Sequence, residues 1–516
     1  MKIHVTAAEP NYHRHLLVAL LGGAIILRLV LTGCGGQFFF GDENRHERGV
    51  ALYQALRLGD FTGVQTALIQ PGHIGFILLG AGLTGLQHLG AQLTPHHDWR
   101  QPENLIFTYP IGAGWLAMFS VLNIWLVHRI CRRAGAGAAE AGWAALFMAC
   151  SNTGFYYARH FLPYDAALSF ALGAIWAGLD RRSFAAGLLA GTGYHLYNGY
   201  WYFVPIVLAL PLLAEAPDRS RLRQLVVAGA GAALVVTAPI LAGLALAGRS
   251  YWQSVLAFSG TVNQGLYSEG WSLPWEYFWH SEGLLGLAIL LGITCALLAA
   301  GRSGRGVEWR VRLWLGIIAM SYGWLVLFSM GLEKFVVYAR SVKPLVPFFC
   351  LAGGWAAARL LTNQPRATRL LATGCCITAA AHFAPHFTRM FPSEVEIGIL
   401  RDVGNPKHTL SVAGSLYAPL SLPVQRPDLV LANAQMLYPV RDFIDYPAGI
   451  TVLSVEHPLS YLPFQYESHN PRERTLLRIH DIRIRLIKLT QPDNIPDDLP
   501  TLLRFTSSDQ PDGRRL

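Results

Sequence analysis

Long apolar runs recur along the whole chain, and they limit its fold more than any other feature. The runs cover residues 15–33, 72–94, 105–128, 138–157, 163–180, 183–198, 200–214, 224–247, 283–300, 312–331, 344–362 and 369–388. A transmembrane helix needs about 20 mainly apolar residues. Only 14% of the 516 residues are charged, whereas about 25% is usual for soluble proteins. The sequence therefore predicts an all-α polytopic membrane domain.

The basic residues between these runs predict the topology. Residues 129–133, 181–182, 219–223, 302–312 and 366–369 form basic loops. All of them fall on the side of Lys2 and Arg14 if the run 72–94 lies along the membrane interface instead of crossing it. Because cytoplasmic loops are enriched in Lys and Arg, this arrangement predicts about eleven transmembrane helices and a cytoplasmic N-terminus. The loop 34–104 would then be extracytoplasmic.

The composition changes after about residue 390. Segments 409–412, 428–432, 449–455 and 475–489 alternate with turn-forming residues and are typical of strands. Within Asp481–Leu489, apolar residues alternate with arginines, as in a half-buried strand. We therefore predict a transmembrane domain at 1–390 and a small extracytoplasmic α/β or β-rich domain at 391–516.

Polar side chains that could carry chemistry gather on the predicted extracytoplasmic side. Asp42 and Glu43 follow the first apolar run directly, where carboxylates are costly unless they face water or take part in chemistry. The other candidates on this side are His73, Arg159, Asp165, His195, Lys334, Tyr338, Arg340 and Lys343.

Each candidate also has a structural interpretation. Asp42 could cap a helix or lie in a solvated loop, and Asp165 could cap a helix that follows Pro163. Arg340 and Lys343 could be interfacial anchors that extend to lipid headgroups. The net charge of +9 does not predict nucleic-acid binding, because the basic residues sit in short loops between apolar runs.

Several motifs occur in a fixed order along residues 15–390. Arg28 precedes Asp42-Glu43, which is followed by Ala-x-x-x-Gly-Asp at 55–60. Tyr164-Asp165 opens a later apolar run, and Tyr338-x-Arg340 precedes two prolines. This order resembles the GT-C superfamily of polyprenyl-phosphate-sugar-dependent glycosyltransferases. Protein O-mannosyltransferases and lipid A aminoarabinose transferases are members of that group.

The resemblance implies a membrane enzyme that transfers a hexosyl or pentosyl unit from a polyprenyl-phosphate donor to an extracytoplasmic glycan, lipid or protein. Asp42 occupies the position of the general base, Glu43 would assist it, and Asp165 would line the same cavity. Cations must stabilise the leaving phosphate, and Arg340 is preferred because its guanidinium can make two hydrogen bonds to a phosphate. Lys343, Lys334 and His195 are further candidates.

The sequence departs from this family at Gln70, where many members carry an acidic residue. No cofactor is certain, and a divalent metal is allowed, with His73 able to bind either a metal or phosphate. The expected location is the bacterial inner membrane, with membrane lipid as a partner and with the site and the C-terminal domain outside. The alternative function is a transporter or flippase for a lipid-linked glycan, which would need polar groups near the membrane midplane on several helices. A degenerate, non-catalytic relative would have a similar sequence.

Overall fold

The computed structural model describes residues 11–33, 45–69, 73–93, 102–213, 220–248, 253, 273–304, 306–332 and 343–388, together with four strands in the last quarter of the chain. These residues are mostly helical. Asp42, Glu43, Lys334, Tyr338 and Arg340 lie outside the described residues.

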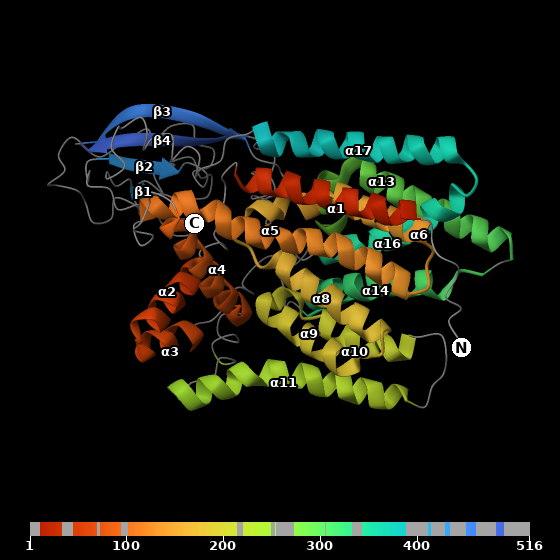
Figure 1. The fold of residues 1–516 in the computed structure, drawn as a ribbon, viewed down its shortest axis with the longest axis horizontal. Coiled ribbons are helices and arrows are strands. Elements are labelled where there is room, and N and C mark those ends of the chain that lie inside the picture. The colour runs from red at the N-terminus through yellow and green to blue at the C-terminus, as the bar shows by residue number, and fades with distance from the viewer. Residues whose placement is uncertain are drawn as a thin grey trace.

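A bundle of helices makes up most of the molecule, and most of these helices run in one general direction (Figure 1). Its members are α1 (Asn11–Thr32), α5 (Pro102–Arg133), α6 (Ala138–Cys150), α8 (Tyr164–Leu179), α9 (Ser183–Leu196), α10 (Phe203–Leu213), α11 (Arg221–Ala247), α13 (Leu273–Arg302), α14 (Trp309–Val326), α16 (Val346–Leu360) and α17 (Pro365–Thr388).

Five segments of the described helices are long and apolar enough to cross a membrane. They are Arg14–Thr32, Ile74–Gln92, Pro110–Arg133, Arg221–Ala245 and Ser281–Arg302. The predicted helical membrane domain is confirmed at this level, and the number of spans and their orientation stay predictions.

Short helices occupy the middle of the bundle. Helices α6, α8 and α16 contain 13, 16 and 15 residues, so each is about 20–24 Å long at 1.5 Å per residue. Small residues let them approach closely, because a Cβ atom on Gly354 of α16 would lie 2.7 Å from the Glu140 carbonyl oxygen of α6. Since the hydrocarbon core of a bilayer is about 30 Å thick, these helices are shorter than a full span.

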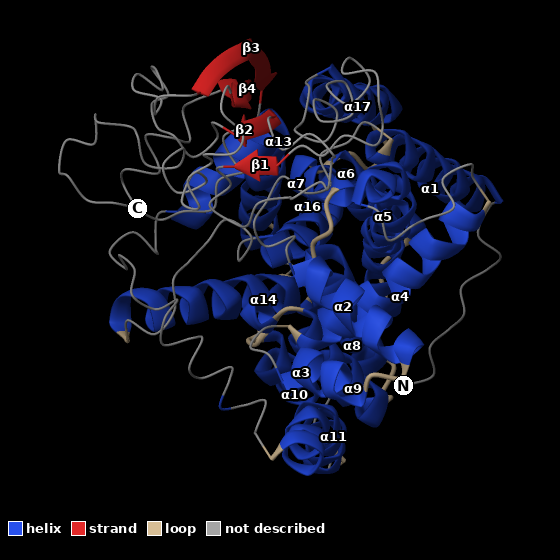
Figure 2. Cartoon of the chain, turned by 90° about the vertical axis from the view of Figure 1, so that its left-hand side faces the viewer, coloured by secondary structure: helices blue, strands red, loops and turns tan. Residues whose placement is uncertain are grey.

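Three helices form a separate unit at one end of the bundle: α2 (Arg45–Leu58), α3 (Phe61–Ile69) and α4 (Ile74–Gln92). Figure 1 shows them together, and Figure 2 looks onto that end. Gly49 of α2 crosses α4 at Gly80, where a Cβ atom on Gly49 would lie 2.6 Å from the Gly80 main chain.

The run predicted to lie along the interface corresponds to α4. Its first turn packs on the C-terminal end of α9, where a Cβ atom on Gly75 would meet the His195 main chain at 2.8 Å. Near its other end, Gly90 packs on Ile111, close to the start of α5. Both contacts lie toward the bundle end remote from the basic loop after Arg133, as an interfacial segment would require. By length and composition alone, α4 is still a candidate span.

Four strands form one sheet with the order β1-β2-β4-β3: β1 (Ser411–Ala413), β2 (Leu429–Asn433), β3 (Ile450–Ser460) and β4 (Asp481–Leu489). Strands β1 and β2 are parallel, whereas β2 and β3 both pair antiparallel with β4. Each strand overlaps one of the four predicted strand segments. The domain boundary near residue 390 stays a prediction.

Candidate functional site

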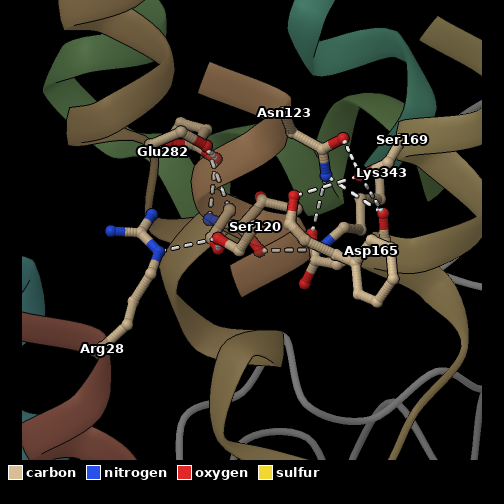
Figure 3. A network of polar contacts seen from close by, with 11 residues as sticks. Arg28, Ser120, Asn123, Asp165, Ser169, Glu282 and Lys343 are labelled. Atoms are coloured by element: carbon tan, nitrogen blue, oxygen red, sulfur yellow. Dashed lines mark hydrogen bonds and ion pairs between the residues drawn. The ribbon is translucent and has the colours of Figure 1, made fainter. Parts of the chain in front are cut away.

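Four charged side chains are buried together inside the bundle (Figure 3). Arg28 comes from α1, Asp165 from the first turn of α8, Glu282 from α13, and Lys343 from the 3-10 turn Lys343–Leu345 that leads into α16. None of the four is more than 4% exposed. Because an isolated buried charge is very costly, such groups must be compensated by partners.

Lys343 and Asp165 form the central ion pair. Lys343 Nζ lies 2.8 Å from Asp165 Oδ1 and 3.4 Å from the Thr153 carbonyl oxygen. It also lies 4.5 Å from the centre of the Tyr157 ring, which adds a cation–π attraction. The tertiary fold thus brings together two of the residues that the sequence singled out.

A second set of hydrogen bonds holds the Asp165 carboxylate from the side of α5. Asn123 Nδ2 donates to Asp165 Oδ1 and to the Asp165 carbonyl oxygen, both at 3.2 Å. Ser169 Oγ lies 2.7 Å from Asn123 Oδ1 and orients that amide. The N-cap interpretation of Asp165 is wrong, because Pro163 occupies the N-cap position and makes no side-chain cap bond.

Arg28 is the second buried cation. Its Nε donates to Ser120 Oγ at 2.7 Å, and Ser120 Oγ in turn donates to the Gly154 carbonyl oxygen at 2.7 Å. Nη1 donates to Ala24 O at 3.3 Å, and the guanidinium lies over the Phe155 ring at 5.5 Å. Nη2 has no hydrogen-bond partner among the described residues. Within the described part of the chain, one donor of this buried guanidinium therefore has no acceptor.

Glu282 accepts hydrogen bonds from the turn 151–154, the first turn of the short helix α7 (Asn152–Tyr156), which follows α6. Its carboxylate receives Ser151 Oγ at 2.8 Å, the Asn152 main-chain N–H at 2.9 Å and the Thr153 main-chain N–H at 3.0 Å. The chain adopts φ 49° and ψ −125° at Gly283. Glycine suits this backbone conformation because it has no Cβ atom, and the resulting kink in α13 occurs beside the carboxylate.

Arg159 extends the network toward α17. Its Nη1 donates to the His386 carbonyl oxygen at 3.1 Å, and His386 Nε2 lies 3.0 Å from Asn152 Oδ1. Asn152 belongs to the turn held by Glu282. The described network therefore contains three cations and two carboxylates, an excess of one positive charge.

Residues of this cluster lie at a similar height along their helices. At 1.5 Å per residue, Arg28, Ser120 and Asp165 are about 20–24 Å from the basic ends of their helices, near Arg14, Arg133 and Arg181. If these helices cross the membrane as the sequence predicts, this distance is about two thirds to four fifths of a 30 Å hydrocarbon core. Ionisable groups at such a depth are functional candidates by default.

Two predicted histidines, His73 and His195, make their described hydrogen bonds elsewhere. His73 Nδ1 lies 2.9 Å from Asn198 Oδ1, and its ring packs edge-on against Tyr197. Tyr197 packs against Tyr164, the neighbour of Asp165. A series of aromatic contacts therefore connects His73 to the site. His195 Nε2 donates to the Val235 carbonyl oxygen at 3.0 Å and links α9 to α11.

Sequence reasoning did not select Glu282, Ser120 or Asn123, and it used Arg28 only as part of a motif. A signal was present, since Arg28 and Asn123 interrupt apolar runs and Glu282 borders one. No group of three or more metal-ligating side chains occurs within the described part of the chain. The functional roles of Asp42, Glu43, Lys334, Tyr338 and Arg340 stay predictions.

Comparison with known proteins adds no relative, because no protein-family model matches the chain and no curated protein is similar to it.

Proposed function

We propose that the protein is a membrane-embedded glycosyltransferase that transfers a sugar from a polyprenyl-phosphate donor to an extracytoplasmic acceptor. The observation that carries this proposal is the pair of buried cations, Arg28 and Lys343, which lie in one hydrogen-bonded cluster with Asp165, at the depth that the predicted spans would give them. A lipid phosphate is an anion whose tail remains in the bilayer. It is therefore the class of ligand that buried cations at this depth would suit.

The chemistry requires a base and a cation site. Asp42 is proposed to take the proton from the acceptor hydroxyl or amine, while the acceptor attacks the anomeric carbon with inversion. The bond between that carbon and the phosphate oxygen breaks, and the phosphate leaves with the electron pair. Arg28 Nη2 and Lys343 would stabilise the developing negative charge, because fixed donors in a site shielded from water act strongly on charge.

The remaining candidates have supporting roles in this proposal. Glu43 would orient Asp42, and Arg340, Lys334 and Tyr338 would contact the phosphate or sugar from the segment just before Lys343. Asp165 would hold Lys343 in place as well as line the cavity. A divalent metal is not required by this scheme, although it remains compatible with it.

A donor screen tests the function. Purified protein in lipid vesicles would receive polyprenyl phosphates carrying hexoses or pentoses, and release of polyprenyl phosphate would be measured. We expect release with at least one donor and its loss in Asp42→Asn. Asp60→Asn is the matched control, because Asp60 is exposed and its carboxylate only caps α3, accepting the Gly63 N–H at 3.0 Å.

Two results would count against the proposal. Folded protein that releases polyprenyl phosphate from no donor would contradict the glycosyltransferase function. Normal turnover by Asp42→Asn would remove Asp42 as the base and leave the function open to another carboxylate.

Transport of a lipid-linked glycan is a second candidate, and the position of Ser120 and Asn123 on α5 favours it. Transporters place polar groups near the midplane, and these two residues lie in the middle part of the candidate span Pro110–Arg133, whereas Asp165 lies in the first turn of α8. Movement of a labelled lipid-linked glycan across a vesicle membrane, without release of polyprenyl phosphate, would favour transport over transfer.

A further inference from the structure

The Glu282 carboxylate is a buried charge that contacts neither cation directly in the described hydrogen bonds. We propose that Glu282 is a positioning residue, which sets Arg28 and Lys343 for an anionic lipid phosphate by holding the turn 151–154. The ligand named in this inference rests on the proposed function, whereas the positioning itself does not.

The first step is the set of hydrogen bonds by which the Glu282 carboxylate holds the turn 151–154. Three donors of residues 151–153 meet the two carboxylate oxygens within 3.0 Å. Hydrogen bonds to a charged acceptor are about twice as strong as those between neutral groups. Asn152 Nδ2 also donates to the Ser281 carbonyl oxygen at 3.0 Å, so the start of α7 is tied to α13 at the adjacent residues Ser281 and Glu282.

The second step is the contact between the turn and the cations. The Thr153 carbonyl oxygen lies 3.4 Å from Lys343 Nζ. The Gly154 carbonyl oxygen accepts from Ser120 Oγ, which accepts from Arg28 Nε. Consecutive peptide groups therefore connect one carboxylate to both cations. A shift of the turn would move or release Lys343 and Arg28 together.

A positioning role and a counter-charge role of Glu282 predict opposite changes in anion binding, so an experiment can distinguish them. If Glu282 acted only as a counter-charge, its neutralisation would leave the cluster more positive and tighten binding of an anion. If Glu282 acts by position, the same change loosens the turn and weakens binding. In Glu282→Gln one carboxylate oxygen becomes an NH₂ group, which faces N–H donors instead of accepting from them.

The experiment compares Glu282→Gln with Glu140→Gln in the full chain. Glu140 is also buried, and its carboxylate pairs with Arg310 through hydrogen bonds of 3.0 and 2.9 Å near the opposite end of α6. The control thus repeats the same substitution on a buried, paired glutamate away from the cluster. Ser151→Ala is a second variant that leaves the charge in place, because it removes one donor to Glu282 together with the bond from the Gly154 N–H to Ser151 Oγ.

Two measurements are made on each variant. The first is the rate at which formaldehyde and borohydride methylate Lys343, read by peptide mass spectrometry. The second is the affinity for polyprenyl phosphate. We expect Glu282→Gln to be methylated faster and to bind about tenfold more weakly, the scale of one charge-assisted hydrogen bond. Ser151→Ala should change in the same direction by less, and Glu140→Gln should match the wild type.

Unchanged methylation in Glu282→Gln, or binding as tight as that of the wild type or tighter, would overturn the inference. A wild-type protein that binds no polyprenyl phosphate would speak against the proposed function. In that case the methylation rates still decide whether Glu282 positions Lys343.

Discussion

Replacement of Lys343 by methionine removes one half of the central ion pair and leaves a side chain of similar length. The two charges are 2.8 Å apart, and their side chains are 1% and 6% exposed. At an effective dielectric constant of about 20, the attraction is about 6 kcal/mol before desolvation is subtracted. Removal of one partner from a buried pair typically costs about 3–5 kcal/mol, because the other charge stays buried.

In Lys343→Met, the Asp165 carboxylate would keep the Asn123 amide at 3.2 Å as its remaining described side-chain donor. We therefore expect the free energy of unfolding to fall by about 3–5 kcal/mol. Titration with a denaturing detergent, followed by tryptophan fluorescence, measures this change. Lys343→Met should also abolish binding of polyprenyl phosphate under conditions where the protein remains folded.

A double-mutant cycle separates the pair from its surroundings. Asp165→Asn combined with Lys343→Met leaves neither charge of the pair buried alone. The double variant should therefore lose at least about 2 kcal/mol less free energy of unfolding than the sum of the two single variants. The control is Arg133→Met, which breaks a 2.7 Å pair with Asp180 whose side chains are 34% and 25% exposed. An exposed pair contributes about 0–1 kcal/mol. Additive single changes, or an equally large effect of Arg133→Met, would refute the reasoning.

Three further predictions concern helix packing, the kink and pH. Gly187→Ala should destabilise the α9–α11 contact, because a Cβ atom would overlap the Ala228 carbonyl oxygen, whereas Gly142→Ala has nothing within 4 Å and should be neutral in detergent unfolding. Gly283→Ala should lower the free energy of unfolding by about 1–3 kcal/mol in the same assay, because φ +49° with ψ −125° is a backbone conformation that residues with a Cβ atom rarely adopt; an unchanged stability would show that the kink relaxes freely. Burial holds the pKa of His46, on α2, at about 4 instead of 6.5, so the unfolded chain takes up a proton first as the pH falls, and stability is lost below about pH 6.5. Between pH 7.5 and 5 this loss should be about 2 kcal/mol, and His46→Phe should lack that part of the pH dependence.

Local patterns predicted the helices closely where the chain is apolar and the run is bounded by charge or proline. The run 163–180 becomes α8 at Tyr164–Leu179, because Pro163 precedes it and Asp180 follows it. The run 138–157 is instead broken at Ser151, between α6, which ends at Cys150, and α7. There the turn 151–154 bonds to Glu282, a residue that lies 131 positions away from Ser151. No local pattern contains that contact.

The functional site likewise combines residues that local sequence predicts with contacts that only the tertiary structure provides. The residue types and their side of the membrane marked Asp165 and Lys343 as candidates, yet an interfacial anchor was an equally good interpretation of Lys343. Its 1% exposure and its ion pair with Asp165 do not fit an anchor that extends to lipid headgroups. The two residues are 178 positions apart, so only helix packing could bring them together.

The sequence by itself determined that this is a helical membrane protein with polar candidates toward one end of its helices, because hydrophobic run length and charge position are local properties. Only the tertiary structure decided which of those candidates meet, and it added Arg28 and Glu282 to the cluster. The physical reason is that burial makes an unpaired charge prohibitively costly. Each buried group therefore acquires its role from partners supplied by distant helices.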